Sequence, residues 1–305
     1  MRILIAGGSG LVGRALIRKI RQESFWEVAV LTRNPSAGLA DVRKFYWNPA
    51  SGEWDPALSE WPADALVNLA GENVGAGSWT PARRAVLLQS RLEALDTLAR
   101  LAGVWSRRPR VISMSASGYY GHVPGTQLVS ETHPPGKDFL AHVCVAWESK
   151  AFELFGNPEH HLLIFRLGVV LDSQEGALPR MLQPVRFAFG QPLGCGRQRI
   201  PWIHIEDVAN SLLMALKRPE IQGVFNLAAP ESVSNAEFIK TLCQAAGRFF
   251  VPIPVPAIAL RLLLGDQADL ILKGVAMDIT RWSETGFRFA YPNLRPALNH
   301  LISNS

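Results

Sequence analysis

Gly7-Gly8-Ser9-Gly10-Leu11-Val12-Gly13 is the most informative segment of this 305-residue chain for its fold. It follows a short apolar run and opens a segment with helical apolar spacing, the context typical of a strand–turn–helix that binds a dinucleotide. A side chain at Gly10 would collide with a diphosphate, Gly13 lets the helix pack on the strand, and the helix N-terminus attracts phosphates. We therefore predict a dinucleotide site at Gly7, Gly10, Leu11, Val12 and Gly13.

Short apolar runs alternate with helical stretches through the first half of the chain, which favours parallel strands joined by helical crossovers. The predicted strands are Arg2–Ala6, Val28–Thr32, Lys44–Trp47, Ala65–Leu69, Arg110–Ser115, Leu162–Leu167 and Gly223–Leu227. The predicted helices are Leu11–Arg21, Thr80–Ala102, Phe139–Phe155, Glu206–Lys217 and Asn235–Ala246. The fold class is thus α/β, a Rossmann-type doubly wound parallel sheet.

A change of composition after about residue 170 predicts a second structural unit. Residues 173–201 are rich in Gly, Pro and Arg, and the tail from Pro252 is Leu-rich and helical. We expect a Rossmann domain over 1–171, completed by 202–228, and a smaller, mainly helical C-terminal substrate lobe over 172–201 and 229–305. Within that lobe, 251–300 forms the terminal small domain.

The end of the second predicted strand bears on the choice of cofactor. An acidic residue there would bind the ribose hydroxyls of NAD, but this chain has Thr32 and Arg33. A guanidinium can hold the 2′-phosphate of NADP through charge-assisted hydrogen bonds. We therefore predict NADP as the cofactor. The alternative is that Arg33 is an ordinary surface residue and that the site does not discriminate between NADP and NAD.

Composition narrows the classes of partner. The chain is 48% apolar and 19% charged, with a formal net charge of +5 that suits a phosphate-bearing ligand. No basic stripe with aromatics points to nucleic acid, and no apolar run is long enough for a membrane span or a signal peptide. The three Cys lack metal-ligand spacing. We expect a cytoplasmic protein with a small-molecule substrate and no metal. Whether the chain forms a homodimer is left open.

Four later motifs carry a family resemblance: Asn68-Leu69-Ala70-Gly71-Glu72, Ser90-Arg91, Ser115-Ala116-Ser117-Gly118-Tyr119-Tyr120-Gly121, and Pro201-Trp202-Ile203-His204-Ile205-Glu206-Asp207. With the glycine turn, they make the chain resemble the extended short-chain dehydrogenase/reductases, in the atypical "epimerase family" branch that ends in a small domain of unknown function. The resemblance covers nearly the whole chain. It implies that Leu69, Ala70 and Gly71 lie beside the adenosine and ribose, that Arg91 reaches the cofactor phosphates, and that Gly168 and Val169 face the nicotinamide.

The usual catalytic pair of that superfamily is missing. A Tyr transfers the proton and a Lys four residues later lowers its pKa, but none of the four Tyr has such a Lys. The family's helix register places Leu140 and Cys144 at the two positions. Ser115 or Ser117, with Tyr119 or Tyr120, could substitute, and Ser115 and Tyr120 are our catalytic candidates. Cys144 could be a nucleophile, an acid or an inert core residue.

Two further residues are candidates for substrate binding. His204 could titrate near neutrality or orient a loop through Asp207, and Arg197, like Arg199, could hold an anionic group or lie on the surface. Two functions fit these features. The first is an NADP(H)-dependent oxidoreductase or epimerase acting on a small substrate, with nucleotide sugars among the candidates. The alternative is a non-catalytic NADP(H)-binding regulatory or interaction protein.

Overall fold

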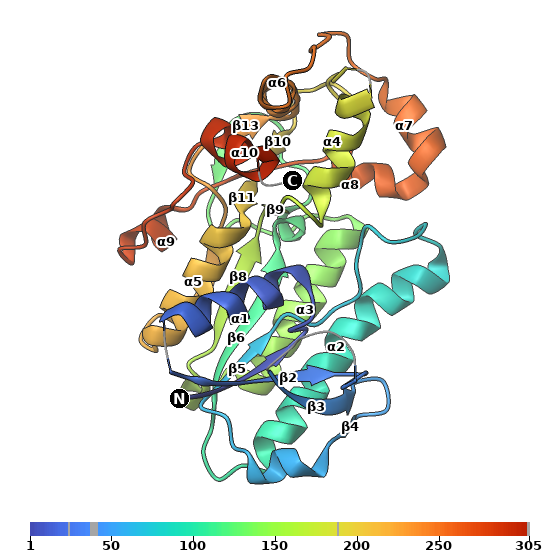
Figure 1. Ribbon diagram of the computed structural model, residues 1–305. Coiled ribbons are helices and arrows are strands. Elements are labelled where there is room, and N and C mark those ends of the chain that lie inside the picture. Colours follow the sequence, from blue (N-terminus) through green and yellow to red (C-terminus); the bar gives the residue numbers. More distant parts are fainter. Residues whose placement is uncertain (24, 37–41, 188, 304–305) are drawn as a thin grey trace.

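A parallel sheet organises the chain up to Leu227 (Figure 1). The computed structural model describes residues 1–23, 25–36, 42–187 and 189–303. Within these residues the sheet has eight strands in the order β12-β8-β6-β5-β1-β2-β3-β4, and only β4 runs antiparallel to its neighbour. The strands are β1 Arg2–Ala6, β2 Glu27–Thr32, β3 Arg43–Asn48, β4 Glu53–Trp54, β5 Ala65–Asn68, β6 Arg110–Ala116, β8 Leu163–Leu167 and β12 Gly223–Leu227.

The strands form where the sequence has short, continuous apolar runs, because both faces of the sheet are covered. Ile3, Leu4 and Ile5 in β1 are fully buried, as are Leu163 and Phe165 in β8. The chain order reverses at β1, with β2 on one side and β5 on the other. In an open parallel sheet, this reversal opens the crevice in which ligands bind at the carboxyl ends of the strands.

Helices cover both faces of this sheet. α1 Leu11–Glu23 packs against α5 Ile205–Lys217 on one face, and α2 Pro81–Gly103 packs against α3 Phe139–Phe155 on the other (Figure 1). Thr80 caps α2 by accepting the N–H of Arg83, and Asp138 caps α3 by accepting the N–H of Ala141. The predicted doubly wound α/β fold is confirmed.

A smaller helical part lies beyond the carboxyl ends of the strands (Figure 1). It has its own apolar core, which includes Leu178, Leu182, Phe238, Leu242 and Leu298. Its helices are α4 Ala177–Phe187, α6 Asn235–Ala245, α7 Ala257–Leu264, α8 Asp269–Leu272 and α10 Leu294–Ser303. In the described part of the chain, three pairs of short strands link distant segments: β9 Val169–Leu171 with β11 Trp202–His204, β10 Arg199–Ile200 with β13 Val233–Ser234, and β7 Leu128–Val129 with β14 Ala276–Met277.

One segment of the expected C-terminal lobe packs on the Rossmann sheet. Trp282, in α9 Thr280–Glu284, is fully buried, and its ring meets Phe165 edge-on at 4.9 Å. It also contacts Phe225 of β12, at 5.6 Å between ring centroids. The tail therefore crosses back to the first domain before it ends in α10.

Helix α4 is absent from the elements that the sequence predicts, because the segment is rich in Gly, Pro and Arg. Leu178, Leu182 and Val185 are nevertheless spaced as one helix face and are buried. Pro184 lies inside the helix and obscures that pattern, since proline in a helix interior removes a hydrogen bond.

Candidate cofactor and substrate site

The glycine turn joins β1 to α1, and its geometry requires residues without side chains. Gly7 has φ +78°, and a Cβ there would lie 2.7 Å from the backbone of Leu69. A Cβ at Gly13 would lie 2.5 Å from Gly8 Cα. The N–H of Arg14 binds Gly10 O at 2.9 Å, so the N–H groups just before it have no acceptor inside the helix. The turn thus fits a phosphate group at its exposed side.

The loop after β5 forms the next wall of the crevice. Leu69 donates its N–H to Ala6 O at 2.9 Å, and Ala70 donates its N–H to Asn68 Oδ1 at 3.2 Å. Arg91 donates to Glu72 O at 3.1 Å and to Leu87 O at 2.7 Å, so its guanidinium holds this loop. A Cβ on Gly71 would lie 3.2 Å from Arg91 Cζ.

Arg91 therefore lies under the loop, where the resemblance implied a contact with phosphates. Its guanidinium is 5.1 Å from the centroid of the Trp147 ring. Burial lowers the pKa of Arg91. The role in phosphate binding stays a prediction, and the contacts seen are those of a residue that fixes the loop.

Arg33 lies at the carboxyl end of β2, where the sheet faces the crevice. Its side chain is 75% exposed, and its ion pair with Glu72 spans 3.9 Å. Glu72 has a closer partner, since Arg83 Nη1 lies 3.0 Å from its carboxylate. Thr32 Oγ1 accepts the N–H of Asn34 at 3.2 Å and shapes the turn. The guanidinium of Arg33 is thus loosely held and accessible to an anion.

A buried polar network lies at the carboxyl ends of β6 and β8. Ser115 donates to Glu148 Oε1 at 2.6 Å, and Arg166 binds both oxygens of that carboxylate, at 3.0 and 2.8 Å. Arg166 also donates to the Tyr120 hydroxyl at 3.0 Å, which in turn donates to Asn226 Oδ1 at 2.6 Å. The side chains of Arg166 and Glu148 are 4% and 7% exposed.

This network contains both catalytic candidates, Ser115 and Tyr120. Each hydroxyl already donates a hydrogen bond within it. Tyr120 is 2% exposed, and burial raises its pKa to about 12. Tyr119 is less buried, and Arg166 Cζ lies 3.3 Å from the centroid of its ring. No local pattern in the sequence indicates the Glu148–Arg166 pair, because its members are 18 residues apart on a helix and a strand.

Leu140 and Cys144, which the family's helix register assigns to the positions of the absent Tyr and Lys, face the turn that follows β6. A Cβ on Gly118 would lie 3.3 Å from Leu140 Cβ and 3.8 Å from Cys144 Sγ. Burial raises the pKa of the Cys144 thiol to about 12, which keeps it protonated at neutral pH. This thiol has the properties of a core residue.

The strand end at Gly168 is in close contact with a neighbouring segment. A Cβ on Gly168 would lie 2.2 Å from Pro201 O, and Val169 donates its N–H to the same oxygen at 2.6 Å. Gly168 donates its N–H to Leu227 O at 2.9 Å. The glycine is therefore required for packing here, and its role toward the nicotinamide stays a prediction.

His204 is fully buried at the start of α5. Its Nδ1 accepts the N–H of Glu206 at 3.1 Å, so the ring proton is on Nε2, which lies 3.1 Å from His300 Nδ1. The ring stacks on Tyr291 at 3.8 Å. Burial, together with His300, lowers its pKa to about 3. Asp207 does not orient His204; it accepts the N–H groups of residues 290 and 291, at 2.6 and 3.0 Å.

The two Arg candidates for substrate binding, Arg197 and Arg199, have different surroundings in the structure. Arg197 is exposed beside Gln198, whose amide donates to Leu193 O at 2.8 Å and Ile271 O at 2.9 Å. Arg199 is partly buried, donates to Ser232 O at 3.1 Å and lies 3.4 Å from Glu237. Arg199 therefore stabilises the start of α6, and the predicted role of Arg197 remains a prediction.

A pocket that the sequence did not predict lies between the two parts of the chain. It has a volume of about 110 Å³ and lies where α2 and α3 begin, against the segment that includes the turn η4 Gly265–Ala268. Its lining residues are Trp79, Arg84, Asp138, Phe139, Leu140, Asp266 and Asp269. The pocket depends on long-range contacts with the tail, which no local pattern around Trp79 or Leu140 indicates.

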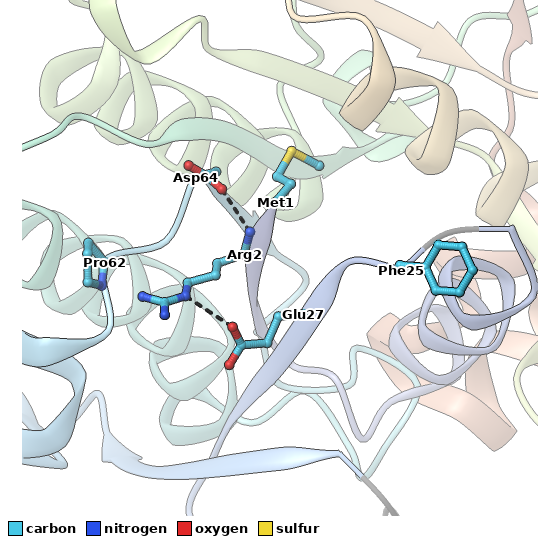
Figure 2. A pocket seen from close by; sticks show the side chains of 6 residues that line it. All are labelled: Met1, Arg2, Phe25, Glu27, Pro62 and Asp64. Atoms are coloured by element: carbon cyan, nitrogen blue, oxygen red, sulfur yellow. Dashed lines mark hydrogen bonds and ion pairs between the residues drawn. The ribbon is translucent and has the colours of Figure 1, made fainter.

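A second, shallow pocket of about 520 Å³ lies at the amino ends of β1 and β2 (Figure 2). Arg2 crosses it, binding Asp64 through its backbone N–H at 2.8 Å and Glu27 through Nε at 3.0 Å. Because ligands of open parallel sheets bind at the carboxyl ends, this pocket is at the wrong end of the sheet for the cofactor. Among the described residues there is no group of three or more His, Cys, Asp or Glu placed to hold a metal ion, and no helix could span a membrane.

Comparison with known proteins agrees with this geometry. The NAD dependent epimerase/dehydratase family matches residues 3–228, which include the glycine turn and both walls of the crevice. The chain belongs to this family. Residues 255–301 match a domain of unknown function, DUF1731, and span α7 to α10. The predicted branch of the extended short-chain dehydrogenase/reductases is therefore confirmed.

The mouse and human members of this epimerase family match along their whole length. Epimerase family protein SDR39U1 from mouse is 34% identical and covers 99% of this chain and 100% of its own. A crystal structure of human SDR39U1 with NADPH has a TM-score of 0.87 at 34% identity, covering 100% of both chains. A structure of a UDP-glucose 4-epimerase from Thermus thermophilus with NAD, at 19% identity and TM-score 0.76, covers 100% of both chains and shares the fold alone.

Proposed function

We propose that this chain binds NADP(H) in the crevice between the glycine turn and the loop after β5. The observation that carries the proposal is the pairing of a turn that only glycine can form with the exposed Arg33 guanidinium one strand away. The turn would hold the diphosphate and Arg33 the 2′-phosphate, while Leu69 and Ala70 would contact the adenosine side. NADPH in the human SDR39U1 crystal structure supports this assignment.

We further propose that the protein is an oxidoreductase or epimerase-like enzyme acting on a small molecule. A bound nicotinamide would supply or take up a hydride at a carbon of the substrate. In the reducing direction, the carbonyl oxygen takes one proton and the product is an alcohol. Gly168 and Val169 would border the nicotinamide half, since they follow β8 at the carboxyl edge of the sheet.

Ser115 and Tyr120 would act in this reaction through the buried network. Both hydroxyls already donate, to Glu148 and Asn226, so in this arrangement they fix the turn after β6 and transfer no proton. A proton for the substrate oxygen would then come from water.

Isothermal titration with NADPH and NADH tests the cofactor assignment. Arg33→Ala should weaken NADPH binding about tenfold or more, because a charge-assisted hydrogen bond contributes about 1.5–3 kcal/mol, and should leave NADH binding unchanged. Arg107→Ala is the matched control, since Arg107 is 76% exposed and pairs with Asp64 at the other end of the sheet. Equal losses for both cofactors, or none for NADPH, would contradict the role of Arg33.

The alternative is a non-catalytic NADP(H)-binding regulator, favoured by Leu140 and Cys144 in place of the Tyr and Lys. A screen for NADPH consumption with aldehydes, ketones and sugars separates the two functions. Turnover that depends on Arg33 supports the enzyme, whereas saturable NADPH binding without turnover in any class supports the regulator.

A further inference from the structure

Helix α7 presents its larger apolar side to solvent. All eight residues of this helix are described, and only Leu260 among them is buried. Ile258, Leu262 and Leu263 are 74%, 86% and 81% exposed. At 3.6 residues per turn, these side chains and Ala259 between them cover one continuous side of the helix, away from Leu260. The outward side of α7 is therefore an uninterrupted aliphatic surface.

The stability of α7 depends on packing, because a helix of this length is marginal in water by itself. The helix packs on η4 and lies at the margin of the helical part (Figure 1). The segment that leads into it, Pro-Ile-Pro-Val-Pro over residues 252–256, has no polar side chain, and Ile253 is 66% exposed. A partner on the outward side would therefore stabilise the helix and remove apolar area from water.

The exposed surface has the size of an interface. The four side chains at positions 253, 258, 262 and 263 together expose roughly 600 Å², and the largest apolar patch on a typical monomer covers about 300–600 Å². A stable complex buries about 800 Å² on each partner. These side chains supply most of that area, and Ala257 and Ala259, which are also exposed, add to it.

The charges around α7 distinguish between the partners that could cover it. Arg261, the one charged residue of the helix, already binds Asp269 at 3.0 Å. The helix is followed by Asp266, a carboxylate that is 62% exposed and pairs with Arg84. A helix that lies on a membrane carries free Lys or Arg beside its apolar face, which meet anionic headgroups. The pairing of Arg261 and the exposed carboxylate therefore oppose a membrane.

We propose that the outward side of α7 forms a two-fold interface with α7 of a second copy of this chain. In such an interface the same residues come from both copies, so a charged face would repel its own copy whereas an aliphatic face is complementary to itself. Homodimer interfaces are also more apolar than those of transient complexes between different proteins. The neutral, aliphatic character of α7 therefore favours a second copy over another protein, and the dimer does not depend on the cofactor assignment.

Sedimentation equilibrium of the cofactor-free full chain tests this interface. The wild-type chain should be a dimer at micromolar concentrations. Leu262→Glu should raise the dissociation constant at least about tenfold, because each copy would bring a carboxylate into an apolar interface. Val104→Glu is the matched control, since Val104 is 52% exposed at the end of α2 and gains the same charge there. The control should remain a dimer, and circular dichroism should show both variants folded.

Chemical cross-linking gives a second measurement, which does not require the dimer to be broken. In a Cys195→Ser background the remaining native thiols, Cys144 and Cys243, are buried. Leu262→Cys then adds an exposed thiol on α7, and a short bismaleimide should join the two copies, because packed helices lie about 8–10 Å apart. Val104→Cys in the same background is the control and should stay a single chain on a denaturing gel.

Three results would overturn the inference: the wild-type chain is a monomer at micromolar concentrations, Leu262→Glu and Val104→Glu weaken the dimer equally, or the Leu262→Cys chains are not joined. A dimer that is unaffected by Leu262→Glu would place the interface elsewhere on the molecule. Flotation with vesicles of phosphatidylcholine and phosphatidylserine examines the other partner. A monomer that binds these vesicles, and no longer binds them as Leu262→Glu, would assign α7 to a membrane instead.

Discussion

Replacing Arg166 by Leu should strongly destabilise the fold, because it leaves the carboxylate of Glu148 buried without its cation. The two side chains are 4% and 7% exposed and lie 2.8 Å apart. Removing one partner of such a pair costs about 3–5 kcal/mol. The change also removes the donors to Tyr120 Oη and Glu131 O, which favours the upper part of that range.

Urea unfolding followed by circular dichroism measures this loss, in the absence of NADPH so that ligand binding does not mask it. At roughly 2 °C per kcal/mol for a chain of this size, the melting temperature should fall by about 6–10 °C. Lys150→Leu is the control, because Lys150 lies on α3, the helix that carries Glu148. Its ion pair with Asp96 spans 2.9 Å, but the two side chains are 24% and 48% exposed, so the loss should be far smaller than that of Arg166→Leu.

The double variant Glu148→Leu/Arg166→Leu isolates the cause. Replacing both members of a buried pair by apolar residues is often close to neutral, so the double variant should recover most of the stability. Recovery should be incomplete, because Ser115 and Tyr120 each lose a partner. The reasoning is refuted if Arg166→Leu costs no more than Lys150→Leu, or if the double variant is no more stable than the single one.

Three other substitutions have defined outcomes. Gly13→Ala should lower stability by about 1–3 kcal/mol and weaken NADPH binding, since its Cβ would lie 2.5 Å from the backbone of the preceding turn; calorimetry measures both, and wild-type values would contradict the close approach. His204 has a pKa of about 3 when folded against an ordinary 6.5, so the unfolded chain binds its proton first and stability falls as pH drops from 6.5 toward 3. His204→Asn keeps a capping acceptor and should flatten that slope by up to about 1.4 kcal/mol per pH unit in urea titrations, whereas an unchanged slope would place the dependence elsewhere. Tyr120→Phe should cost about 1–3 kcal/mol by leaving Asn226 Oδ1 without this donor, with Tyr119→Phe within about 0.5 kcal/mol as the control; equal losses would contradict the network.

The parts of the fold that follow from the sequence are those set by local rules. β1 and β12 have the predicted bounds, and α3 begins and ends where its apolar spacing does. The glycine turn can be recognised because strand, turn and helix are consecutive in the chain. Helix α4 escapes prediction because Pro184 and the surrounding composition hide three buried residues at helical spacing.

The site follows less completely from the sequence, since its key contacts join distant residues. Nothing local pairs Glu148, on a helix, with Arg166, on a later strand. Likewise, the short contact of Arg84 with Asp266 spans 182 positions. Residue type predicts which groups could do chemistry, but burial decides which remain accessible: Arg33 is open, whereas Tyr120 is enclosed.

One face of α3 bears on the source of the proton in the proposed reaction. Leu140, Cys144 and Glu148 follow one another at four-residue spacing, so they share a face of the helix. Leu140 lines the pocket, Cys144 is buried with a raised pKa, and Glu148 is paired with Arg166. None of the three takes the place of the missing Tyr, since Leu140 has no titratable group, Cys144 is buried and Glu148 already holds Arg166. If the chain is an enzyme, as we propose, we therefore expect the proton for the substrate oxygen to come from water rather than from this face of α3.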